Sequence, residues 1–169
     1  MENKPTLKSL ILLYGTILAV ITILISVVKY VLGNHLERNA WESMIGIALM
    51  IILIVQPIRI LKKSNNGLLS ISQALKIGLG VAVISGVLSI FYFVIFANFI
   101  EPNFANDVLD AQMSEALRQN PNLSTAELEK GKELGKGLVM PMLYGGIIIV
   151  NLFLGFIISL ITGLALKKE

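Results

Sequence analysis

Residues 77–100 read IGLGVAVISGVLSIFYFVIFANFI, a run of 24 residues without one charged side chain. A helix rises about 1.5 Å per residue, so about 20 apolar residues cross the hydrocarbon core of a bilayer, which is about 30 Å thick. The strands of a membrane β-barrel would alternate polar and apolar residues, and this run does not. It therefore predicts a transmembrane helix.

Three further apolar stretches predict three further spans. We expect the four spans at about residues 9–31, 42–61, 77–100 and 138–166, in one membrane domain that covers residues 1–169. Only 15% of the residues are charged, against about 25% in a typical soluble domain. The mean hydropathy is +0.79. The first stretch is longer than the apolar core of a signal peptide, so we interpret it as a retained helix. The predicted fold class is all-α, an integral membrane four-helix bundle.

The basic residues outside the spans predict the orientation of the chain. The two termini and the loop of residues 59–76 together carry eight Lys and Arg and two acids. The segments on the other side of the membrane carry six basic residues and nine acids. Because short loops rich in Lys and Arg stay in the cytoplasm, we expect both termini and this loop to be cytoplasmic.

The segment of residues 101–137, between the third and fourth spans, has the character of a soluble protein. Apolar residues recur at helical spacing over residues 104–119, and Asn-Pro-Asn at 120–122 ends that pattern. Ser124 and Glu127 have capping-box spacing and predict the start of a second helix. We expect an extracytoplasmic helical hairpin whose apolar side rests on the membrane surface or on the outer ends of the bundle.

One face of the first hairpin helix is acidic. Asp107 and Asp110 are three residues apart and could share a cation. Two carboxylates without a ligand loop are weak evidence for a site, so we favour a solvated helix face and leave cation binding open.

The cytoplasmic loop contains a helix start of its own. Ser70 and Gln73 have capping-box spacing, which predicts a helix that begins near Ser70 and runs into the third span. We expect Leu68 and Leu69, just before it, in the headgroup boundary of the membrane.

Side chains that carry catalysis are scarce in this sequence. It has no Cys, and its single His, His35, lies in the first outer loop without an evident nucleophile or ligand partner, which favours a surface residue. We find no hydrolase, phosphate-binding or zinc-protease motif. The spans lack ionisable residues, which disfavours a proton-coupled carrier, and no basic face suits a nucleic acid. We expect no enzymatic activity, no cofactor, no metal and no nucleic-acid partner.

Small residues form two stripes at four-residue spacing. They are Gly78, Ala82 and Gly86 on the third span, and Asn151, Gly155, Ser159 and Gly163 on the fourth. Small residues let helix backbones approach closely in lipid. We predict an antiparallel contact that pairs Gly78 with Gly163, Ala82 with Ser159 and Gly86 with Gly155.

Asn151 is the strongest candidate for a polar functional residue. In the predicted register it lies opposite Ser89, and we expect its amide to bond Ser85, Ser89 or a backbone carbonyl. It could instead face a pore or a second subunit, and the sequence leaves this open.

Three features carry a resemblance to a known family. They are SISQALKIG at residues 70–78, FIEPNF at residues 99–104, and a glycine-containing last helix that ends in lysines. With these, the chain resembles domain-of-unknown-function family forty-one ninety-nine over nearly its whole length, although Leu75 stands where members often have Phe. The resemblance implies a four-helix protein of the bacterial inner membrane and transfers no catalytic residue.

Two functional hypotheses follow. The first is a non-enzymatic accessory or interaction subunit whose outer segment, residues 103–136, docks a protein partner. The alternative is a small passive channel or carrier that works as a homo-oligomer. An enzyme acting on lipid would need a cluster of His or carboxylate side chains at a membrane surface, which one sequence cannot reveal.

Overall fold

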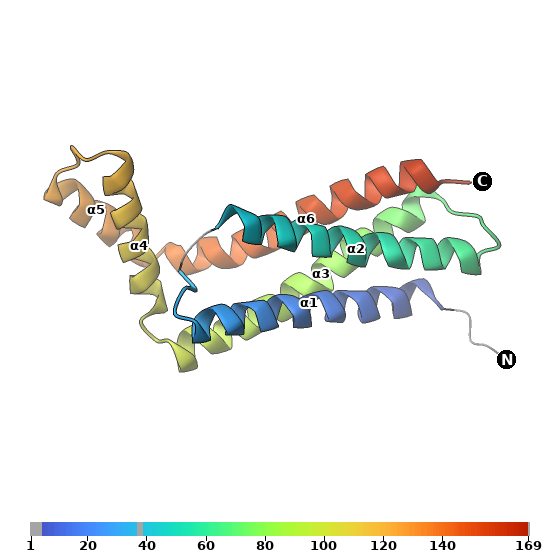
Figure 1. Ribbon diagram of the computed structural model, residues 1–169, viewed down its shortest axis with the longest axis horizontal. Helices are drawn as coiled ribbons and strands as arrows, with labels where there is room; N and C mark the ends of the chain where they lie inside the picture. The colour runs from blue at the N-terminus through green and yellow to red at the C-terminus, as the bar shows by residue number, and fades with distance from the viewer. Residues whose placement is uncertain (1–4, 37–38, 169) are drawn as a thin grey trace.

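The computed structural model describes residues 5–36 and 39–168, which fold into four long helices with a shorter pair at one end (Figure 1). The long helices are α1 (Leu7–Val31), α2 (Ala40–Ser64), α3 (Ile71–Ile95) and α6 (Val139–Leu166), and α3 continues into the π-helical segment η1 (Phe96–Ile100). The hairpin consists of α4 (Phe104–Gln119) and α5 (Thr125–Lys136). Within the described residues, α1, α2, α3 with η1, and α6 are long and apolar enough to cross a membrane. The predicted all-α fold with four spans and an intervening hairpin is confirmed.

The four long helices form a ring in the order α1, α2, α6, α3. The broadest contacts join α3 to α6 and α3 to α1, and α2 completes the ring by packing on α6 and α1. The start of α1, the α2–α3 connection and the end of α6 lie at one end of the bundle, and the hairpin lies at the other (Figure 1). We call these the inner and the outer end, after the orientation that the sequence predicts. At the inner end, Leu69 and Lys168 exchange two backbone hydrogen bonds, of 2.9 and 3.1 Å.

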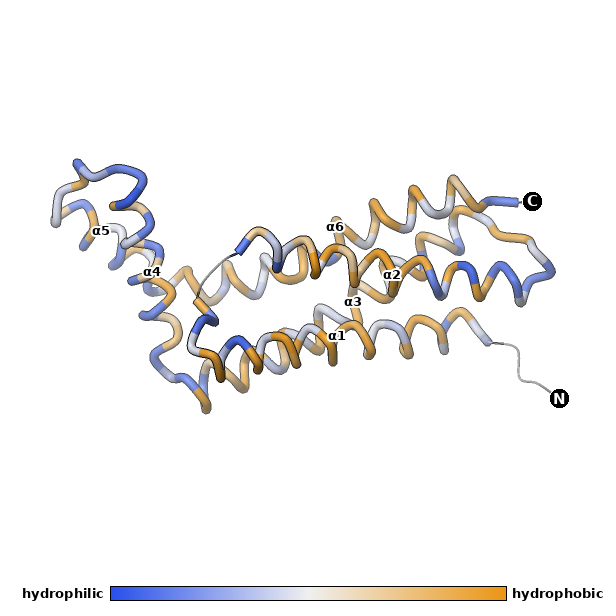
Figure 2. Tube along the Cα trace, in the orientation of Figure 1, coloured by the Kyte–Doolittle hydropathy of each residue, from blue (hydrophilic) through white to orange (hydrophobic). Residues whose placement is uncertain are grey.

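The distribution of hydropathy matches the division of the molecule into long helices and a hairpin. Figure 2 shows apolar residues along the four long helices and polar residues concentrated in the hairpin and at the end of α2. Less than a third of the most apolar part of each span is buried within the protein. The remaining apolar surface is what a bilayer covers.

The start of α3 shows how local sequence sets a helix boundary. The Ser70 hydroxyl accepts from the Gln73 backbone N–H, and the Gln73 side chain accepts from the Ser70 N–H. The predicted helix start near Ser70 is confirmed, so α3 begins six residues before the expected span. The expectation for Leu69 was wrong: this side chain is 1% exposed and lies in the protein core instead of the headgroup boundary.

Buried residues gather in two separate clusters. The inner cluster takes residues from all four long helices. They are Leu10 and Leu18 of α1, buried residues from Met50 to Leu61 of α2, buried residues from Ala74 to Ala82 of α3, and Ile158 of α6. The outer cluster consists of Phe96, Ala97, Phe104, Val108, Leu109 and Val139. Between the two, at residues 20–31, 40–49, 87–95 and 140–154, the spans bury no described residue.

Candidate functional site

The contact between α3 and α6 brings the two small-residue stripes together. A Cβ added at Gly78 would stand 2.2 Å from the Ser159 Cβ and 2.7 Å from the Gly155 carbonyl oxygen. A Cβ added at Gly155 would stand 2.7 Å from the Ala82 Cβ. The helix backbones therefore approach more closely here than any larger side chain would allow.

The register of this contact differs from the predicted one by one helical turn. Gly78 faces Ser159 instead of Gly163, and Gly163 faces Ala74, whose Cβ would be 2.9 Å from a Cβ at Gly163. Ala82 faces Gly155 in the same way. The reason is that a four-residue repeat matches itself again after a shift of four residues.

The observed register also places Asn151 beside a small residue. Its Nδ2 lies 3.9 Å from the position of a Cβ at Gly86, whereas the predicted register set it opposite Ser89 and the neighbouring Ile90. The Asn151 amide donates to the Ile147 carbonyl of its own helix at 2.8 Å. Of the three expected kinds of partner, the structure thus gives a backbone carbonyl. Asn151 and Ser89 are half-buried, while the Ser85 side chain is 2% exposed.

At the outer end, aromatic rings from separate segments form one cluster. Phe96 lies at its centre, with ring-centroid distances of 5.0 Å to Tyr30, 5.5 Å to Phe104 and 6.3 Å to Phe93. The pairs with Tyr30 and Phe104 are edge-to-face and the pair with Phe93 is stacked, and aromatic pairs of both kinds stabilise a structure beyond the burial of apolar area. The cluster joins α1, η1 and the start of α4, and so fixes the hairpin to the bundle.

His35 belongs to this aromatic cluster, so its interpretation as a surface residue was wrong. Its ring lies 5.2 Å from Tyr30 and 6.2 Å from Phe104, measured between centroids. Nε2 lies 3.0 Å from Oε2 of Glu101, and both side chains are about four-fifths buried. Neither imidazole nitrogen makes an aligned hydrogen bond within the described residues. The close contact between these two side chains, packed among the aromatic rings, therefore holds the first outer loop against the end of η1.

Two lysine–carboxylate ion pairs brace the outer end. Lys29 near the end of α1 pairs with Glu42 near the start of α2, across the first outer loop. Lys132 of α5 pairs with Asp110 of α4, so one of the two carboxylates considered for a cation has a lysine partner. Within the described residues, no three His, Cys, Asp or Glu side chains are grouped as a metal site would need.

The hairpin has an anchored helix and an exposed helix. α4 buries Phe104, Val108 and Leu109, while α5 buries no residue and touches α4 at Gly135, where a Cβ would stand 2.5 Å from Leu109 Cδ2. The predicted capping box at Ser124 is confirmed: Glu127 accepts hydrogen bonds from the Ser124 backbone N–H and hydroxyl. These bonds lower the pKa of the Glu127 carboxyl below its usual value.

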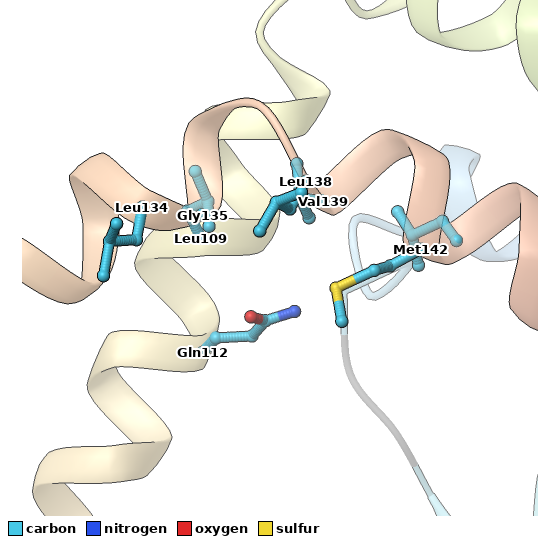
Figure 3. A pocket seen from close by; sticks show the side chains of 8 residues that line it. Leu109, Gln112, Leu134, Gly135, Leu138, Val139 and Met142 are labelled. Carbon is cyan, nitrogen blue, oxygen red and sulfur yellow. The ribbon is translucent and has the colours of Figure 1, made fainter.

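Two pockets lie where the hairpin meets the bundle. The first has a volume of about 350 Å³ and is lined mainly by apolar side chains of α4, the end of α5 and the start of α6 (Figure 3). The second has a volume of about 920 Å³ and lies between α4 and the first outer loop. It mixes apolar residues with polar and charged ones, among them His35, Gln112 and Arg118.

Sequence reasoning missed the outer-end cluster because its members are distant in the chain. No common spacing links Tyr30, His35, Phe96 and Phe104. Within its own segment, none of these residues belongs to a pattern that predicts contact with the others. The only local signal was the crowding of Phe residues in the outer half of the third span. Leu109, which anchors α4, was also outside the predicted apolar face of this helix, which consisted of Phe104, Val108, Ala111 or Met113, and Leu117.

Comparison with known protein families matches residues 13–168 to the family described as "Protein of unknown function (DUF4199)". The chain belongs to this family. The DUF4199 match covers all four spans apart from the first turns of α1, and it includes the hairpin. No curated protein and no solved structure matches the chain. With its four candidate spans, this DUF4199 member is a multi-pass membrane protein.

Proposed function

We propose that this protein is a non-enzymatic interaction subunit that docks a protein partner through its outer hairpin, residues 103–136. The observation that carries this proposal is the contrast within the hairpin: α4 is anchored by Phe104, Val108 and Leu109, whereas α5 buries no residue. A segment that is held in position but exposed over most of its surface suits recognition better than core packing.

The charges of the hairpin indicate the chemistry of the partner. Residues 103–136 carry six carboxylates and four basic side chains, and most of them are exposed. Glu129, Lys130, Glu133 and Lys136 of α5 are all on the surface. A partner with a net basic surface would be complementary to this acidic excess, which would fix its orientation and raise its association rate.

The polar groups elsewhere favour an interaction subunit over a catalyst. The nitrogens of His35 are buried among aromatic rings, so they are poorly placed to exchange protons with a substrate. The contact between His35 and Glu101 at the outer end is accounted for by their packing among the aromatic rings.

The hydrogen bonds of the buried hydroxyls weigh against a passive channel formed by one copy of the chain. The buried hydroxyls of Ser159 and Thr162 donate to carbonyls of their own helix, at 2.6 and 2.7 Å, and so line no polar path. A channel or carrier would have to form between copies of the chain, with Asn151 as the polar candidate. Flux through liposomes that contain the purified protein would support that alternative.

For the location, we propose the bacterial inner membrane with both termini in the cytoplasm. The basic inner loop supports this orientation, which would place the hairpin outside the cytoplasm, and the family resemblance supports the bacterial inner membrane. Because the chain has no Cys, single Cys variants at Asn122 and at Gly67 allow a clean test. An impermeant maleimide should label Asn122→Cys in intact cells and leave Gly67→Cys unlabelled. The reverse pattern would contradict the orientation.

The docking proposal can be tested by photo-crosslinking in native membranes. A photoreactive amino acid at Glu129 should give discrete adducts of higher mass, and the same group at Leu68, which is exposed at the inner end, serves as the control. The double substitution Glu129→Lys and Glu133→Lys, read with the crosslinker at Lys136, should strongly reduce the adducts. Deleting residues 103–136 would be a poorer test, because Phe104, Val108 and Leu109 of the outer cluster would be lost too.

The outcomes separate the hypotheses. Equal adducts from Glu129 and Leu68, or adducts that persist after charge reversal, would contradict docking through an acidic hairpin. An adduct of twice the chain mass would identify a second copy of the same chain as the partner.

A further inference from the structure

The two pockets at the outer end of the bundle share a wall but differ in character, since the smaller is almost entirely apolar and the larger also contains polar and charged side chains. Gln112 of α4 and Leu143 of α6 line both of them. The smaller pocket is otherwise lined by Leu, Val, Met and Gly residues. Figure 3 shows the Gln112 side chain reaching from α4 toward Met142 of α6. The two pockets therefore lie side by side, and we call the smaller one the apolar compartment and the larger one, which also holds the polar and charged side chains, the polar compartment.

The apolar compartment lies where a transmembrane helix emerges from the bilayer. Its lining includes Leu138, Val139 and Met142, which belong to the N-cap and first turn of α6. Leu134, Leu138 and Met142 are 65, 55 and 71% exposed, so the lining continues onto the lipid-facing surface of α6. Such a run of exposed apolar side chains at the membrane boundary is stabilised by contact with hydrocarbon.

The polar compartment lies at the same level of the bundle. Asn39 and His35 of the first outer loop form one wall, and α4 forms the other. Arg118 and Glu115 of α4 line it, with 3.5 Å between Nη1 and Oε2. Arg is the side chain best suited to bind a phosphate, because its guanidinium donates several hydrogen bonds from one planar group.

We propose that these compartments hold one phospholipid of the surrounding leaflet. An acyl chain fills the apolar pocket between α4, α5 and α6, and the phosphate headgroup lies in the polar hollow near Arg118. The bilayer is the source of this ligand, since the apolar lining is continuous with the lipid-covered face of α6. This site would be independent of protein docking, because the exposed charges of α5 lie outside both pockets.

A photoactivatable phospholipid in reconstituted vesicles tests the proposal. The probe carries a diazirine at the methyl end of one acyl chain, a group that ordinarily samples the bilayer centre. After illumination, mass spectrometry compares labelling of residues 134–143 with labelling of residues 149–156, a lipid-facing stretch in the same protein. We expect strong labelling of the pocket stretch. Labelling confined to residues 149–156 and other mid-span positions would overturn the proposal.

A matched pair of variants controls for general disturbance of the hairpin. Leu134→Asp places a charge at the apolar pocket, and Leu117→Asp changes an exposed leucine of α4 that lines neither pocket. Leu134→Asp should lower the pocket labelling about tenfold, because an unpaired charge is incompatible with hydrocarbon. Leu117→Asp should leave it unchanged. Equal effects from the two variants would contradict a defined acyl-chain site.

The headgroup is tested by changing the probe. A diacylglycerol with the same diazirine chain lacks the phosphate, and the variant Arg118→Ala removes its proposed partner. We expect weaker pocket labelling with diacylglycerol, and a phospholipid preference that Arg118→Ala abolishes. Equal labelling by the two probes on the wild-type protein would show that hydrocarbon alone is recognised and would overturn the headgroup assignment.

Discussion

Toward the inner end of the bundle, α3 and α6 touch almost backbone to backbone, with Gly78 against Ser159 and Ala82 against Gly155. At the outer end, the rings of Tyr30, Phe96 and Phe104 fill the space between three segments. The first contact depends on side chains being small, and the second on their being large. In lipid, helices gain little from hydrophobic burial against each other, so close approach supplies the packing energy. Where the chain leaves the bilayer, burial of aromatic area becomes favourable again.

The largest effect should come from filling the closest approach. Gly78→Leu would place atoms into Ser159 and the Gly155 carbonyl, and neither backbone can move without separating the helices. We expect no monodisperse protein to be recovered from detergent, as judged by gel filtration. Gly145→Leu is the control, since a Cβ there meets nothing within 4 Å. If both variants behaved alike, the α3–α6 contact would not be what holds the bundle together.

The outer cluster should respond strongly but locally. Phe104→Ala removes a ring that is 7% exposed, and a buried Phe→Ala change costs about 3–5 kcal/mol. We expect faster hydrogen exchange along α4 and little change at the centres of α3 and α6. Phe99→Ala, at a ring that is 80% exposed, is the control and should change exchange hardly at all. Exchange that accelerated throughout the spans would show that the two ends are not separate packing units.

An engineered disulfide can decide the register between the two helices. A Cβ at Gly86 would stand 4.0 Å from the Asn151 Cβ, close to the spacing of about 3.8 Å in disulfides. The pair Gly86→Cys and Asn151→Cys should therefore oxidise readily and stabilise the protein by about 2–4 kcal/mol. The pair Gly86→Cys and Gly155→Cys, which the sequence alone favoured, should not crosslink. Efficient crosslinking of the second pair would restore the sequence-based register.

The smallest effect should come from a hydroxyl in the inner contact. Ser159→Ala removes a donor that bonds only carbonyls of its own helix, and keeps the Cβ that Gly78 accommodates. We expect a loss below about 1 kcal/mol in the free energy of unfolding, measured by titration of a mild detergent with a denaturing one. A loss above about 2 kcal/mol would mean that the hydroxyl, and not only small size, stabilises the contact.

The sequence by itself determined the spans, the helix starts and the faces that meet. An uncharged run of 24 residues has no stable place except hydrocarbon, so the four spans follow from composition and length. The capping boxes at Ser70 and Ser124 act within one turn, and for that reason local sequence located them correctly. The stripes on α3 and α6 likewise identified the contact surface, because helical spacing puts small residues on one face.

Only the tertiary structure decided the register, the burial of His35 and the pockets. A four-residue repeat fits itself at several offsets, and the offset chosen gives Asn151 and Gly163 the small partners Gly86 and Ala74. His35 meets Glu101 and Phe104 across about 70 residues of sequence, a distance over which no periodicity extends. The pockets depend on how α4 crosses the end of the bundle, and that crossing is set by the combined packing of three segments.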